Sequence, residues 1–146
     1  TKDYPVIIIS QRWFLHTAKP EFLERFNTML DDLVKAGKKV YVLADTPMDG
    51  QLPLRRYYLR QNLGIDIHYV SEDKKEEVRD SAKSEDEVEK IVKQHHGVQW
   101  VDFMQYIPAD KLIDGLPVYF DTNHLNPFGS SKIAEMFIND KRTLLK

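Results

Sequence analysis

The run P-V-I-I-I-S at residues 5–10 constrains the fold more than any other feature of the sequence. It is short, unbroken and rich in β-branched residues, which is typical of a strand covered on both faces. A second run of this kind, K-V-Y-V-L-A, follows at residues 39–44. Such strands belong to parallel sheets, in which the crossover connections place helices over the sheet faces. We therefore expect a parallel sheet with helical connections.

The segments that follow the two runs fit this expectation. From Pro20 the apolar residues fall on one helical stripe, and Gly37 follows the end of the pattern. Residues 53–64 predict a short helix closed by glycine. Residues 65–70 alternate like a strand, and residues 98–103 predict a further strand.

Two helices are predicted in the second half of the chain. The charged residues 71–83 predict a solvated helix face or a surface loop. Ser84 and Glu87 have the spacing of a capping box, which predicts a helix that begins there and runs to Gly97. The last helix carries the apolar residues Ile133, Met136 and Phe137.

The alternation of strands and helices predicts an α/β fold with three layers, in which helices cover both faces of a mostly parallel sheet. With 146 residues, the chain has the size of a single domain, 1–146. Functional groups gather at the carboxyl ends of the strands in such sheets. Those ends fall at residues 10–13, at residues 45–47 and in the loops after residue 103, and we expect them to converge.

Composition excludes several classes of function. The formal charge of -2 and the absence of a basic cluster give no electrostatic case for nucleic acid. No apolar run approaches the roughly 18–20 residues that span a bilayer. There is no cysteine, and no two histidines have the i, i+4 spacing of a zinc helix, so neither a metal nor another cofactor is expected. A glycine-rich phosphate loop is also missing.

The stretch Y-F-D-T-N-H-L-N-P-F-G-S-S-K at residues 119–132 carries the candidate chemistry. A histidine that acts as a general base needs an acceptor on its second ring nitrogen, which fixes the tautomer and stabilises the imidazolium. Asp121, three residues before His124 in a tight turn, can reach that nitrogen. Alternatively, Asp121 only caps a turn and His124 is a polar loop residue. The spacing alone leaves both interpretations open.

A second motif, Asp45-Thr46-Pro47 at a strand end, has the position of a phospho-accepting aspartate in receiver domains. Such a site needs an acidic pair near the first strand to hold a divalent ion. The stretch P-V-I-I-I-S-Q-R-W contains no such pair, so this alternative is weaker.

The motif at residues 119–132, continued by I-A, resembles the last block of the SGNH hydrolase superfamily, D-x-x-H-L before a helix start of small residues. Three stretches in order, I-I-I-S-Q-R-W, V-Y-V-L-A-D-T-P and L-P-V-Y-F-D-T-N-H-L, resemble the SGNH domain fused behind the membrane part of acyltransferase-three proteins. Those proteins O-acetylate bacterial surface polysaccharides. Because the likeness runs across nearly the whole chain, it favours catalysis over a chance pair.

The resemblance implies a role for three residues. His124 would be the general base and Asp121 its orienting partner. Arg12 stands about where other superfamily members carry an asparagine that helps to bind the oxyanion. Its guanidinium would stabilise an oxyanion or hold an anionic sugar; the alternative is a surface arginine at a strand end. Trp13 is expected to pack rather than to stack on a substrate.

The chain departs from the family in one respect. The family nucleophile is the serine of a Gly-Asp-Ser block, and this sequence contains no such block. We expect that serine, and the strand that carries it, to lie upstream of Thr1, so that the chain is the C-terminal portion of an SGNH-like domain. The six serines that are present make poor substitutes: Ser10, Ser71, Ser81, Ser84, Ser130 and Ser131.

The resemblance also sets the expected context. The parent protein would be an O-acetyltransferase or esterase that acts on cell-surface polysaccharide or lipopolysaccharide. Its partners would be a carbohydrate acceptor, an acetyl donor and an N-terminal membrane acyltransferase domain, with the SGNH domain in the periplasm. The alternative is a non-catalytic α/β binding or regulatory module. Without its neighbouring strand, residues 5–10 would form an apolar edge that favours homo-oligomers.

Overall fold

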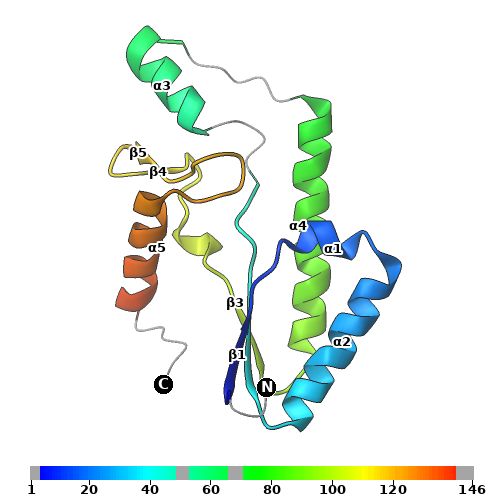
Figure 1. Ribbon diagram of the computed structural model, residues 1–146. Helices are drawn as coiled ribbons and strands as arrows, with labels where there is room; N and C mark the ends of the chain where they lie inside the picture. Colours follow the sequence, from blue (N-terminus) through cyan, green and yellow to red (C-terminus); the bar gives the residue numbers. More distant parts are fainter. Residues whose placement is uncertain (1–3, 49–52, 66–70, 141–146) are drawn as a thin grey trace. The chain divides into compact units, whose positions relative to one another are not determined.

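The structure is a computed structural model that describes residues 4–48, 53–65 and 71–140 (Figure 1). It contains two compact units. The first consists of Thr1–Asp45 and Asp80–Asp102, and the second of Thr46–Arg79 and Phe103–Lys146. This division leaves the single domain over residues 1–146 as a prediction.

A parallel sheet forms the centre of the first unit. Its strands are β1 (Val6–Ile9), β2 (Lys39–Leu43) and β3 (Val98–Val101), in the order β1-β2-β3. Both pairs of neighbours are parallel. The predicted α/β fold with a parallel sheet is therefore confirmed.

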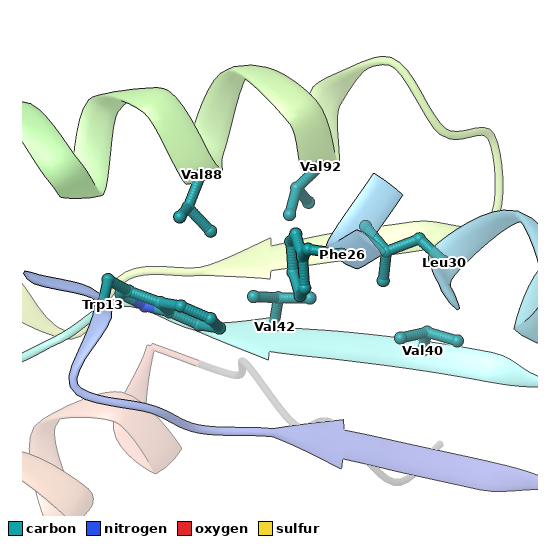
Figure 2. Close-up of a cluster of buried hydrophobic side chains, with 7 residues drawn as sticks. All are labelled: Trp13, Phe26, Leu30, Val40, Val42, Val88 and Val92. Atoms are coloured by element: carbon teal, nitrogen blue, oxygen red, sulfur yellow. The ribbon is translucent and has the colours of Figure 1, made fainter. Parts of the chain in front are cut away.

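Three helices contribute side chains to the core of the first unit: α1 (Trp13–Thr17), α2 (Pro20–Lys35) and α4 (Glu72–Lys93). Side chains alternate along a strand, so Val40 and Val42 point from β2 to the same face. Figure 2 shows the helices meeting these two valines there. The buried cluster consists of Trp13, Phe26, Leu30, Val40, Val42, Val88 and Val92.

The predicted start of a helix at Ser84 is wrong, because α4 already begins at Glu72. Ser84 lies inside the helix and is buried. Its hydroxyl donates to the carbonyl of Asp80 (2.7 Å) and accepts from the hydroxyl of Thr17 (2.7 Å). A serine inside a helix can bond back to the carbonyl four residues earlier. The charged segment before it is the first half of the same helix, where Lys75 pairs with Glu72.

The second unit is built from short elements. They are α3 (Pro53–Leu63), the 3₁₀ helix η1 (Met104–Tyr106), β4 (Leu112–Ile113), β5 (Leu116–Pro117) and α5 (Pro127–Asn139). The helices over residues 53–64 and around Ile133 were predicted, whereas the antiparallel hairpin of β4 and β5 was not. The strand predicted at residues 65–70 lies almost wholly outside the described residues.

Among the residues that the structure describes, no helix is both long enough and apolar enough to cross a bilayer. The 22-residue helix α4 has the length, but its sequence is highly charged.

Strand β1 lies at the edge of the sheet, and no other strand in the described part of the chain pairs with its outer side. Ile8 is 50% exposed. On the other face, Ile7 and Ile9 line an apolar cavity of about 470 Å³ together with Phe22 of α2. An exposed edge strand with apolar side chains on both faces is a template for pairing with another chain.

We expect the 146-residue chain to self-associate through β1. Light scattering should show dimers or larger species that become monomeric in Ile8→Lys, since a charged side chain on an edge strand opposes pairing. Leu63→Lys replaces another exposed apolar residue, on α3, and serves as the control. A monodisperse wild-type monomer would contradict the prediction.

Candidate active site

The D-x-x-H motif lies at the tip of a narrow loop in the second unit. The backbone N–H groups of Phe120 and Asn126 donate to the carbonyls of His124 (2.7 Å) and Val118 (2.9 Å). These two bonds hold the arms of the loop together. Residues 121–123 therefore form a tight tip between paired arms.

The carboxylate of Asp121 organises this tip. Its Oδ1 accepts the backbone N–H of Asn123 (2.9 Å) and of His124 (2.8 Å), and its Oδ2 lies 2.8 Å from Nδ1 of His124. Burial acts to raise the pKa of Asp121, but the hydrogen bonds from Asn123 and His124 together outweigh it and lower that pKa to about 2. The carboxylate is thus ionised at any pH at which the protein would work.

The proton on the ring of His124 follows from this contact. An ionised carboxylate only accepts hydrogen bonds, so Nδ1 of His124 carries a proton, and in the neutral imidazole Nε2 then holds the lone pair. The side chain of His124 is 70% exposed, which leaves Nε2 accessible. The amide nitrogen of Asn123 lies 3.4 Å from both ring nitrogens. The bonding directions of Nδ1 and Nε2 lie in the ring plane and point away from each other. The Asn123 nitrogen, which is equally far from both, therefore lies along neither direction and leaves Nε2 open to another group.

Asp121 therefore makes the contacts that both interpretations of its position predicted. It caps the turn through the backbone N–H groups, and it also orients the imidazole of His124. A base held by a carboxylate, with its second nitrogen accessible, is the arrangement that proton abstraction from a hydroxyl requires.

The loop is joined to α5 by Asn126 and Gly129. Asn126 is the N-cap of α5: its side-chain oxygen accepts the N–H of Gly129 (2.7 Å), and its side-chain nitrogen donates to the carbonyl of Pro117 (2.7 Å). A Cβ atom on Gly129 would lie 2.2 Å from the carbonyl oxygen of Val118. Only glycine permits this close approach.

Arg12 lies in the first unit, directly before α1 at the carboxyl end of β1. Its Nη1 is 3.6 Å from Oδ2 of Asp45, and the two side chains are only 20% and 14% exposed. Nη1 is buried and forms no hydrogen bond with the described residues. Arg12 is therefore not a freely solvated surface arginine.

The surroundings of Arg12 and Asp45 include a buried tryptophan and further carboxylates. Trp13 is buried, in agreement with a packing role, and its indole N–H donates to the carbonyl of Leu43 (3.0 Å) near the end of β2. Burial, followed by the nearby carboxylates of Asp102 and Asp45, raises the pKa of Glu85 to about 7.

These observations place the predicted site residues in two groups. Asp121 and His124 meet in the second unit, whereas Arg12 pairs with Asp45 in the first. The predicted convergence of strand ends is thus observed for β1 and β2, and the convergence of Arg12 with His124 stays a prediction. In the residues that the structure describes, no three His, Asp or Glu side chains gather as a metal ion would require.

Ser71, Ser130 and Ser131 belong to the same unit as His124, and none of them forms a hydrogen bond with its ring in the described residues. Ser81 and Ser84 are buried in the first unit. Ser130 and Ser131 are exposed in the first turns of α5. Within the second unit, no described serine is therefore hydrogen-bonded to the candidate base.

Comparison with protein families shows which family the chain belongs to. The family model described as "SGNH domain (fused to AT3 domains)" matches residues 1–139. The chain belongs to this family. Asp121 and His124 lie in contact in this SGNH domain, and their catalytic roles stay a prediction.

A solved structure supports the fold of this SGNH domain. It is that of a protein from Streptococcus pneumonia, provisionally described as a platelet activating factor, with a TM-score of 0.55 and 12% sequence identity. The match covers 94% of this chain and 59% of that one, so the chain spans less than two thirds of its structural neighbour. At this identity the likeness shows the fold alone. No curated protein matched the sequence.

Gly129→Ala should destabilise the SGNH domain, because the added methyl group would press α5 away from the carbonyl of Val118. Overpacking of this kind costs about 1–3 kcal/mol of the free energy of unfolding. Ser130→Ala is the matched control, since Ser130 is the exposed neighbour in the same helical turn. Urea unfolding of the two variants measures the difference; equal midpoints would contradict the close approach.

Proposed function

We propose that this SGNH domain contributes the histidine base of an O-acetyltransferase that acts on bacterial cell-surface polysaccharide or lipopolysaccharide. The observation that carries the proposal is the 2.8 Å contact between Nδ1 of His124 and Oδ2 of Asp121, with Nε2 left accessible. The family, in which SGNH domains are fused to AT3 domains, supports acyl transfer as the reaction class.

The proposed reaction uses a serine as the acyl carrier. His124 takes the proton of the serine hydroxyl through Nε2 as the hydroxyl attacks the acetyl donor, and gives that proton to the leaving group of the donor. It then takes the proton of the sugar hydroxyl that attacks the acetyl-serine, and returns it to the serine oxygen that leaves. Asp121 stabilises the imidazolium that forms in each step. We propose that this serine comes from outside residues 1–146, because the sequence contains no Gly-Asp-Ser block.

Arg12 is proposed as a hydrogen-bond donor to the oxyanion or to the substrate in this reaction. The proposal is supported by the burial and hydrogen bonding of its guanidinium within the first unit. Its Nη1 is buried beside Asp45 without a hydrogen bond. A buried donor without a hydrogen bond is costly, and a ligand oxygen would remove that cost.

The expected context of the parent protein is part of the proposal. An N-terminal membrane acyltransferase domain would deliver acetyl groups to the SGNH domain on the periplasmic side of the inner membrane. The carbohydrate acceptor would meet them there. Fusion to AT3 domains in the family supports this arrangement.

Substitutions in the parent protein test the base. His124→Ala should abolish hydrolysis of a chromogenic acetyl ester without unfolding the protein, as judged by circular dichroism. Asp121→Asn should lower turnover by about 10⁴-fold through loss of tautomer control. The 146-residue chain alone should show negligible turnover.

The pH dependence of turnover separates the two residues. Because the pKa of Asp121 is lowered to about 2, its carboxylate stays ionised above about pH 4. Activity lost on acidification above that pH therefore comes from a group other than Asp121. Full activity in the His124→Ala variant of the parent would instead favour a non-catalytic binding or regulatory module.

Arg12→Lys in the parent protein tests the donor. Lysine keeps the charge that pairs with Asp45 but loses the planar fork, so we expect turnover to fall on the order of a hundredfold while stability changes little. Arg60→Lys, at an exposed position of α3, is the control. Unchanged kinetics in Arg12→Lys would leave Arg12 with a structural role only.

A further inference from the structure

The loop after β2 forms hydrogen bonds with the turn that carries the candidate base, His124. Thr46 donates its hydroxyl to the backbone carbonyl of Asn123 over 2.6 Å, although the two residues are 77 positions apart. One residue further along, the carbonyl of Pro47 accepts the hydroxyl of Tyr119 (2.9 Å). All four residues belong to the second unit. The loop thus contacts both the arm and the tip of the D-x-x-H turn.

The bond from Thr46 acts on one particular peptide group. The carbonyl of Asn123 and the N–H of His124 belong to the same planar unit. On its N–H side, this unit donates to Oδ1 of Asp121 (2.8 Å), and on its carbonyl side it accepts from Thr46 (2.6 Å). The peptide plane is therefore held at both ends. Its orientation sets the direction in which the side chain of His124 leaves the backbone.

Two features restrict the loop that carries Thr46. Pro47 disfavours the helical conformation for the residue before it, so the backbone of Thr46 is held extended. The bond between Tyr119 and Pro47 then fixes the loop. The hydroxyl of Thr46 thus meets the carbonyl of Asn123 at little cost in conformational entropy.

We propose that Thr46 is a positioning residue for His124. It holds the peptide plane so that Nδ1 of the imidazole faces Asp121 and Nε2 faces the group to be deprotonated. This inference rests on the proposed function, because the benefit of a fixed imidazole is catalytic. Loss of the hydrogen bond from Thr46 would allow the peptide plane between Asn123 and His124 to rotate, which would weaken the contact between His124 and Asp121.

Three variants test the inference. Thr46→Val removes the hydroxyl at nearly constant shape, Thr46→Ser keeps it, and Thr28→Val is the matched control. Thr28 is an exposed residue of α2 whose hydroxyl bonds only within its own helix, to the carbonyl of Glu24 (3.0 Å). Turnover of a chromogenic acetyl ester is measured in the parent protein, well below the unfolding temperature of each variant.

We expect Thr46→Val to lower kcat by about ten- to a hundredfold, because small misplacements of catalytic groups have effects of this size. KM should stay within about twofold, and the acid limb of the pH profile should move. Thr46→Ser should restore most of the activity, and Thr28→Val should behave like the wild type. A loss that serine does not restore would overturn the inference in favour of simple packing, as would unchanged kcat in Thr46→Val.

A second measurement separates this inference from the proposed function. Nitrogen-15 NMR of the imidazole in the 146-residue chain reports the tautomer of His124 without any turnover. The wild type should show the proton on Nδ1, and Thr46→Val a mixture of both tautomers. If His124→Ala leaves the parent active, the proposed function fails, yet the tautomer still decides whether Thr46 positions the ring. An unchanged tautomer in Thr46→Val overturns the inference.

Discussion

The candidate site depends on one carboxylate. Asp121 uses Oδ1 to close the turn on the N–H groups of Asn123 and His124, and Oδ2 to hold the imidazole. The two tasks fall on different oxygens. An asparagine at position 121 can therefore keep the turn with its carbonyl oxygen, while its NH₂ group presents a donor to Nδ1 of His124 and reverses the tautomer. Turn geometry and basicity thus come from one residue but can be separated experimentally.

Local sequence patterns predicted most of the fold. Proline starts α2 at its first position, and Gly37 and Gly64, just past the ends of α2 and α3, have the positive φ that favours glycine. The error at Ser84 has a physical reason, since a capping pattern also occurs where a hydroxyl bonds back within a helix. The hairpin of β4 and β5 was missed although Asp114-Gly115, which has positive φ at both positions, is a strong signal for such a turn.

The site was predictable only where its contacts are local. Asp121 and His124 are three residues apart, so their spacing within a turn was informative. Asn126 was also within reach of sequence analysis, because an N-cap three residues before glycine and directly before proline is a helix start. The bond from Thr46 to Asn123 joins positions 77 residues apart, and no local pattern encodes it. The same holds for Arg12 and Asp45: parallel strands put them at one sheet edge, but their pairing is a matter of side-chain packing.

The charge around Arg12 limits what it can bind. Its guanidinium faces Asp45, and the pKa of nearby Glu85 is raised first by burial and then by the carboxylates of Asp102 and Asp45. A ligand group with a permanent negative charge would approach against these carboxylates as well as lose its own hydration. An oxygen that gains charge only in the transition state avoids most of that cost and still meets a fixed, desolvated donor. Of the two roles proposed for Arg12, its surroundings therefore favour donation to a developing oxyanion over capture of an anionic sugar.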